Sequence, residues 1–120
     1  MLLDGGTTEA PGPKYCFDVT THTKDYGHEN DWKISCTDES CKPCVNEEDF
    51  ENDNQYTQEC CLPQDQTEFF ITCIDEWGDG WHGGYLEVGG TKYCSNFTTG
   101  TEYQETLIIE GGGTEGLIYL

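Results

Sequence analysis

Cysteine content is the feature that most constrains how this chain can fold. The 120 residues contain eight cysteines, at Cys16, Cys36, Cys41, Cys44, Cys60, Cys61, Cys73 and Cys94. An even cysteine count in a small chain is typical of a disulfide framework in an extracellular protein. Four bridges at about 2–4 kcal/mol each would supply stability that a thin core cannot. The sequence therefore predicts that all eight are oxidised, in a secreted protein, with the pairing left open.

The cysteine spacing also admits two other interpretations. Cys41 and Cys44 are separated by two residues, as in zinc sites and in redox-active CxxC motifs. A structural zinc site needs a second matched pair, which the adjacent Cys60 and Cys61 do not supply. Adjacent cysteines are expected to bond to different partners. Disulfides are the leading interpretation, and zinc and a redox motif are the alternatives.

The charge balance excludes one class of function and disfavours another. The chain has 24 Asp and Glu residues against 5 Lys, and its net charge is −19. Nucleic-acid binding is excluded, because phosphate contacts need clustered cations. The same charge disfavours binding to an anionic membrane surface. No apolar run is long enough for a membrane-spanning helix, so we expect no membrane insertion.

Residue patterns predict an all-β fold. Leu, Ile, Val and Phe are few, which favours disorder in so acidic a chain, but cysteines, aromatics and an excess of Thr over Ala favour strands. Tyr15, Phe17 and Val19 alternate with polar residues, as in a half-buried strand. Similar patterns predict strands near 32–36, 67–75, 85–88, 92–95, 103–110 and 117–120, with turns at 25–27 and 89–90. Residues 37–60 are expected to be a long acidic loop held by its four cysteines. The prediction is a small, disulfide-rich antiparallel β-sandwich, jelly-roll-like, spanning residues 15–110.

The two ends of the chain differ from this domain. Residues 1–14 place an apolar tip before a Gly-, Thr- and Pro-rich stretch, which predicts an extended N-terminal arm. Residues 111–120 form a glycine linker followed by a C-terminal apolar strand. An arm of about 11 residues can span about 35 Å, so its tip can reach a neighbouring subunit and add a strand to its sheet. The alternative is an unstructured start and an ordinary last strand. The candidate assembly residues are Met1, Leu2, Leu3, Leu117, Ile118 and Leu120.

Two segments resemble a secreted β-sandwich module of algae, protists and some bacteria. That module has a D-x-Y-G-D-G-W-N-G-G turn after a strand that begins C-L-P, with an upstream D-x-Y-G-x-E-x-x-W-x-I hairpin. Here residues 61–63 and 69–84 match the first pattern, and residues 25–34 match the second. The departures are Trp77, where Tyr is usual, and His82, where Asn is usual; the second weakens a metal role carried over to that position. The resemblance covers about residues 15–110 and implies a fold and an extracellular location, without an established catalytic activity.

Acidic residues in the glycine-rich turn are the candidate metal ligands. Asp75, Glu76 and Asp79 lie within five residues, and carboxylate oxygens on a tight loop are typical Ca²⁺ ligands. Glu29 and Asp31 can add ligands if the two turns lie together. The spacing is not that of an EF-hand. The alternative is a solvated acidic turn in which a tryptophan is anchored in the core.

Other patterns bear on sugar binding and catalysis. Five aromatic residues are candidates for a sugar-stacking platform, although most aromatics in this chain are needed for the core: Trp32, Trp77, Trp81, Tyr85 and Tyr93. No carboxylate pair stands out for acid–base catalysis, and His22, His28 and His82 have no evident nucleophilic partner. We therefore expect no enzymatic activity.

Glycosylation signals complete the hypothesis. Asn96 begins an Asn-Phe-Thr sequon, and Thr7, Thr8, Thr98, Thr99 and Thr101 are candidate O-glycan sites. A small, acidic chain with a sugar site also resembles, more loosely, a protomer of the extracellular glycoprotein fibrils of aquatic microorganisms. The sequence predicts a non-enzymatic structural subunit of an extracellular glycoprotein filament that binds other copies of itself. The alternative is a calcium-dependent carbohydrate-binding or adhesion module.

Overall fold

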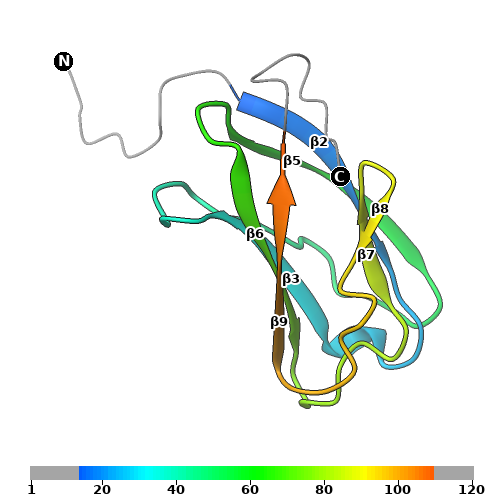
Figure 1. Cartoon of the computed structure of the whole chain (residues 1–120). Helices are drawn as coiled ribbons and strands as arrows, with labels where there is room; N and C mark the ends of the chain where they lie inside the picture. Colours follow the sequence, from blue (N-terminus) through cyan, green and yellow to red (C-terminus); the bar gives the residue numbers. More distant parts are fainter. Residues whose placement is uncertain (1–13, 110–120) are drawn as a thin grey trace.

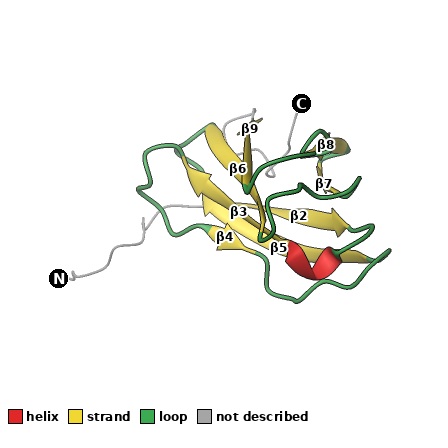
Figure 2. Ribbon diagram, turned by 90° about the horizontal axis from the view of Figure 1, so that it is seen from below, coloured by secondary structure: helices red, strands yellow, loops and turns green. Residues whose placement is uncertain are grey.

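The computed structural model describes residues 14–109, which form two four-stranded antiparallel sheets packed face to face (Figures 1 and 2). The first sheet has the order β5-β2-β7-β8, with β5 (Gln55–Pro63), β2 (Lys14–His22), β7 (Tyr85–Val88) and β8 (Thr91–Tyr93). The second has the order β4-β3-β6-β9, with β4 (Cys44–Val45), β3 (Asn30–Cys36), β6 (Glu68–Asp75) and β9 (Glu102–Ile108). The one helical element in this part of the chain is the 3₁₀ turn η1 (Gly27–Glu29). The predicted β-sandwich is confirmed.

The core lies between the sheets and follows from the alternating pattern of the strands. In β2, Tyr15, Phe17 and Val19 are buried, while the residues between them face outward. Two tryptophans at the centre also satisfy their polar atoms. Trp32 Nε1 donates to Thr21 Oγ1 at 2.9 Å, and Trp81 Nε1 donates to the Ile74 carbonyl at 2.9 Å. Burial of these rings therefore costs no hydrogen bond.

All eight cysteines are paired, which confirms the predicted disulfide framework. The four bonds are Cys16–Cys61, Cys36–Cys41, Cys44–Cys60 and Cys73–Cys94. The adjacent Cys60 and Cys61 have different partners, because successive strand residues face opposite sides. Cys41 and Cys44 are both oxidised to other partners, so the zinc and redox alternatives are wrong. Four disulfides are compatible with an extracellular protein.

Two of these bonds join the sheets to each other. Cys44 in β4 bonds to Cys60 in β5, and Cys73 in β6 bonds to Cys94 directly after β8. Each therefore links a strand of the second sheet to the first. The thin core is thus supplemented by covalent bonds between its two layers.

The prediction that residues 37–60 form a loop is wrong, because this segment contains β4 and most of β5. β5 pairs with β2 over nine residues, from Lys14 opposite Pro63 to His22 opposite Gln55. The first half of β5 alternates exposed residues with the half-buried Tyr56 and Gln58. Because neither face of this half of β5 is fully apolar, the sequence pattern does not predict a strand here. The strand forms through its pairing with β2.

The sandwich has two different ends. At one, called the open end, Lys14 begins β2, Pro63 ends β5 and Ile108 ends β9. At the other, called the loop end, residues 23–29 and 75–84 connect the strands. Predictions for the arm and the C-terminal strand, at Met1, Leu2, Leu3, Thr7, Thr8, Leu117, Ile118 and Leu120, lie outside the described residues. Within residues 14–109, no helix has the length and apolar character needed to cross a bilayer.

Candidate functional site

Two turns that are far apart in sequence meet at the loop end, which is the condition under which Glu29 and Asp31 could add metal ligands. The Glu76 amide donates to the Glu29 carbonyl at 3.1 Å. The rings of Tyr26 and His82 lie against each other, with centroids 4.8 Å apart. Both residues have a positive φ, 59° for Tyr26 and 54° for His82. Side chains of residues 25–34 and of the 75–84 loop therefore lie close together at the loop end.

Glycine determines how closely the loop can fold. Gly80 has φ +81°, and a Cβ atom there would collide with the Phe97 carbonyl and the Thr98 backbone. Because Gly80 has no Cβ, the loop packs closely against the backbone of residues 97 and 98. In this arrangement the amides of Asp79 and Gly80 both donate to Asp75 Oδ2, the second at 2.8 Å. The Gly-Asp-Gly sequence is thus required for the backbone to wrap around the Asp75 carboxylate.

Polar groups buried in this region are incompletely satisfied. Asp75 is fully buried, and its Oδ1 makes no hydrogen bond although Oδ2 accepts two. Glu29 is 6% exposed, and its Oε1 makes none. The buried side-chain amide of Asn30 also has no hydrogen-bond partner. Buried acceptors without donors are costly, so these atoms mark a place where a cation or a proton would be stabilising.

A group of possible ligands surrounds these atoms. One ligand atom each from Glu29, Asp79 and His82 lie within 4.8 Å of one another. His82 Nε2 is 3.3 Å from Asp79 Oδ1 and is shielded from solvent. Burial raises the pKa of Glu29, and the charges of Asp79 and Asp75 raise it further. A hydrogen bond with Asp75 lowers the pKa of Asp79, and His82 lowers it further.

The predicted metal ligands are only partly brought together. Asp75 and Asp79 are in the cluster, and Glu29 joins them from the upstream turn. The Glu76 side chain is exposed, and Asp31 Oδ1 instead accepts from Asn46 Nδ2 at 3.0 Å. His82 was not among the predicted ligands, although its position three residues after Asp79 in a glycine-rich turn was a usable signal.

Most of the proposed sugar-stacking aromatics belong to the core. Trp32, Trp81 and Tyr93 are buried, so they present no face to a ligand. Trp77 is 71% exposed at the tip of the loop. Tyr85 is half-buried. The sequence could not assign Trp77 and Trp81 to surface and core, because the alternation is lost in the glycine-rich loop.

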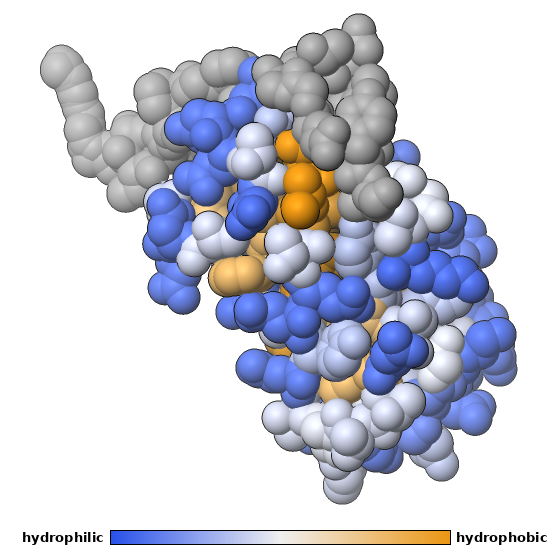
Figure 3. Space-filling model, in the orientation of Figure 1, coloured by the Kyte–Doolittle hydropathy of each residue, from blue (hydrophilic) through white to orange (hydrophobic). Residues whose placement is uncertain are grey.

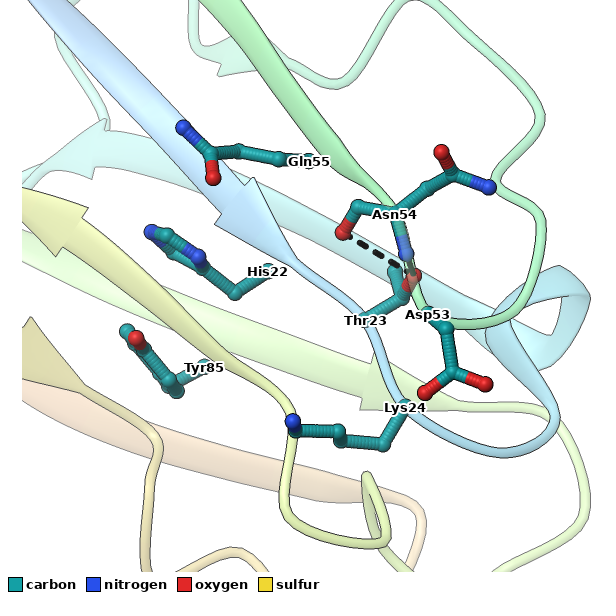
Figure 4. Close-up of a pocket in the computed structure, with 7 residues that line it drawn as sticks. All are labelled: His22, Thr23, Lys24, Asp53, Asn54, Gln55 and Tyr85. Carbon is teal, nitrogen blue, oxygen red and sulfur yellow. Dashed lines mark hydrogen bonds between the residues drawn. The ribbon is translucent and has the colours of Figure 1, made fainter.

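Tyr85 lines a polar cleft of about 420 Å³ on the outer face of the first sheet (Figure 4). Its lining is His22, Thr23, Lys24, Asp53, Asn54, Gln55 and Tyr85. Gln55, His22 and Tyr85 occupy one row across β5, β2 and β7. The His22 and Tyr85 rings stack with centroids 4.4 Å apart, and His22 Nε2 lies 2.9 Å from Glu87 Oε1. Only Tyr85 was singled out in the sequence, because the others come together through strand register.

The sequon lies in the connection between β8 and β9. Asn96 and Thr98 are exposed, and Phe97 between them is buried. The position allows an attached glycan to extend into solvent, and glycosylation at Asn96 remains a prediction.

Comparison with known proteins gives no match to a family model, a curated protein or a solved structure. The resemblance to the secreted module with the Gly-Asp-Gly-Trp turn therefore stays a prediction.

Proposed function

We propose that this protein is a secreted, non-enzymatic structural subunit of an extracellular glycoprotein filament. Subunits join when the N-terminal arm of one copy adds a strand beside β2 of the next. The observation that carries the proposal is the incomplete pairing of β2. β5 pairs along its whole length, but β7 pairs only at Thr20–His22. Among the described strands, residues 15–19 thus have a neighbouring strand on one side only.

The backbone of this open edge is oriented to accept a strand. The Thr23 amide donates to the Asn54 carbonyl, which faces the β5 side. Because strand residues alternate, the hydrogen-bonding groups of Cys16 and Asp18 point away from β5. The Cα atoms of Cys16 and Cys61 are 4.1 Å apart, in keeping with the closer, non-hydrogen-bonded type of antiparallel pair. Cys16 and Asp18 thus present backbone donors and acceptors to the open side.

Strand direction favours an arm from another copy. β9 ends at Ile108, opposite Glu68, at the same open end where Lys14 begins β2 (Figure 1). A segment that continued directly from β9 into the gap would run parallel to β2. All pairs between the described strands are antiparallel. An arm from a neighbouring copy is free to take that orientation.

An exposed apolar residue lies at the same open end, on the outer face of β9. Ile108 is 40% exposed, and the strongest hydrophobic colour in Figure 3 lies where β9 ends. The Met1-Leu2-Leu3 tip is the apolar segment that would cover it. A contact of this kind between head and tail does not close on itself, so repetition gives a filament. The net charge of −19 opposes assembly, so added salt or divalent cations should promote it.

The test compares the full chain with a deletion of residues 1–6 by electron microscopy and light scattering. We expect filaments from the full chain only, with the four disulfides intact in both. Asp18→Pro removes a backbone amide that faces the open side and leaves the hydrogen bonds to β5 in place. A subunit with this substitution should therefore fail to accept the arm of a neighbouring copy. Asp18→Asn keeps the amide and is the matched control. Filaments that persist in the deletion, or monodisperse full-length monomers at high concentration and high salt, would contradict the proposal.

A second candidate is a calcium-dependent carbohydrate-binding or adhesion module, and the cleft at His22 and Tyr85 favours it. Gly83, next to His82, lies against the Lys24 side chain, which lines the cleft. A cation at the loop end would therefore order one wall of the cleft. Glycan-array binding should be lost in Tyr85→Ala, kept in the control Trp77→Ala, and reduced by chelator. An array that stays silent with and without Ca²⁺ would exclude this function.

A further inference from the structure

We infer that Glu29, Asp79 and His82, with Asp75 behind them, form a divalent-cation site whose ligands favour Zn²⁺ over Ca²⁺. The site is independent of filament formation through the arm. One ligand comes from η1 and the others from the 75–84 loop, and their ligand atoms lie within 4.8 Å of one another. A cation there would contact two segments separated by 46 positions or more in sequence.

Buried, unpartnered atoms separate this cluster from an ordinary acidic surface. Glu29 is 94% removed from solvent, and its Oε1 has no hydrogen-bond donor. Oδ1 of the fully buried Asp75 is in the same condition, while Nε2 of His82 lies 3.3 Å from Asp79 Oδ1 and has no other partner among the described residues. Two buried carboxylate oxygens without a donor, at the meeting point of two turns, are not explained by packing. One metal ion can satisfy acceptors that no protein donor reaches.

The competing way to neutralise the cluster is a proton on Glu29. A proton would let Glu29 hydrogen-bond to Asp75 and would leave His82 Nε2 facing Asp79 Oδ1 alone. A metal ion engages both carboxylates and the imidazole together. The two explanations therefore differ in whether His82 matters, and this difference decides the choice of variants.

The donor set determines which metal fits. Ca²⁺ takes six to eight oxygen ligands, and this cluster offers few: Asp75 Oδ2 is occupied by two amides, and Asp31 bonds to Asn46. Zn²⁺ binds imidazole nitrogens and carboxylate oxygens in four-coordinate sites, so two carboxylates and an imidazole would leave one position for water. The sequence-based expectation of Ca²⁺ was made without His82. With that residue placed in the cluster, we assign the site to Zn²⁺.

The experiment measures binding of zinc chloride to metal-free, full-length protein without an affinity tag, by calorimetry and thermal unfolding. We expect one ion per chain, and a rise in melting temperature that exceeds the effect of calcium chloride at the same concentration. Glu29→Gln and His82→Asn should each weaken zinc binding by at least about tenfold. Asparagine is chosen because it tolerates the positive φ of His82 better than most residues.

Control variants separate the site from general acidity and from other histidines. Glu76→Gln removes an exposed carboxylate in the same loop, and His28→Asn removes an exposed imidazole beside Glu29. Both should bind zinc like the parent. His82→Asn should also narrow the preference for Zn²⁺ over Ca²⁺, because it replaces a nitrogen ligand by an oxygen.

Cobalt supplies a readout that does not depend on stability. Co²⁺ in place of Zn²⁺ should give visible absorption that His82→Asn changes and His28→Asn does not. If Glu29→Gln fails to fold, Asp79→Asn alters a half-exposed ligand and should still weaken binding. If calorimetry shows no heat of zinc binding to the parent protein, the site is overturned. The same holds if zinc binding is unchanged in Glu29→Gln, Asp79→Asn and His82→Asn. Tighter binding of Ca²⁺ than of Zn²⁺ by the parent protein would overturn the metal assignment.

Discussion

At the loop end, two turns are held together by backbone hydrogen bonds, glycine contacts and buried carboxylates, whereas the open end leaves a strand edge without a described neighbour. Asp75 accepts from two amides of its own loop, and the Glu76 amide reaches across to Glu29. By contrast, Cys16 and Asp18 present their backbone groups where no described strand lies. Within residues 14–109, the loop end carries buried side-chain oxygens without a donor, and the open end carries backbone groups with no described strand beside them.

The difference indicates what each end can bind. Side-chain oxygens and an imidazole crowded into one small volume suit a cation, which needs convergent ligands. A row of backbone groups along β2 suits another strand, which needs an extended edge. We therefore expect changes at the loop end to affect stability and metal binding, and changes at the open end to affect assembly.

Disulfide removal should show the largest difference between the ends. Cys73–Cys94 spans 21 residues and joins the sheets, while Cys36–Cys41 spans 5 residues and closes a loop at the open end. Replacing both members of the first pair by serine should lower the free energy of unfolding by about 3 kcal/mol, and of the second by about 2 kcal/mol. Urea denaturation measures both. Equal losses of unfolding free energy in the two variants would mean that neither the length of the closed loop nor its position in the sandwich determines the stabilisation.

Glycine replacement tests the tight loop by itself. In Gly80→Ala, the new Cβ would collide with the Phe97 carbonyl, and alanine would also have to adopt φ +81°. We expect a loss of about 2 kcal/mol, since a left-handed conformation alone costs about 1–2 kcal/mol. Gly90→Ala is the matched control, because Gly90 has φ +84° with no atom near its Cβ position. Thermal unfolding should show a larger loss of stability for Gly80→Ala than for Gly90→Ala. A similar loss at both positions would mean that the positive φ alone, and not the collision with Phe97, causes the effect.

The same contrast explains how much could be predicted from the sequence. Alternating apolar residues predicted β2, β3, β6 and β9, because their inner faces are continuous. β5 was missed since half of it alternates exposed residues with half-buried ones and depends on β2 for its pairing. The sequence could name Glu29 and Asp31 as further ligands only on the condition that the two turns meet, and it did not include His82 in the ligand set. The contact between Gly80 and Phe97 determines which carboxylates point inward. This contact joins residues far apart in sequence, so a local pattern cannot reveal it.

Cleft formation was equally hard to predict. His22 and Gln55 are 33 positions apart, and only the β2–β5 register places them in one row with Tyr85. The disulfide pairing depends on the same register, as in the opposed Cys16 and Cys61. Oxidation followed from cysteine count and chain size, but partner choice needs the pairing of strands.

Alkaline titration of Tyr93 should give the smallest effect and reports on the packing between the two ends. Burial and the charge of Glu105 raise the pKa of Tyr93 to about 12. An unfolded tyrosine has a pKa of about 10, so the folded state resists ionisation. The contribution of Tyr93 to stability is therefore fully present below pH 10 and is lost as pH rises from about 10 through about 12.

Tyr93→Phe isolates that contribution. Between pH 9 and pH 11 the parent should lose about 1 kcal/mol more than the variant, because phenylalanine has no proton to release. Urea denaturation at the two pH values, completed before alkali attacks the disulfides, measures the difference. Since the other tyrosines and the lysines titrate in the same range, an identical loss in parent and variant would assign it to them. Tyr93 would then be accessible to hydroxide in the folded protein.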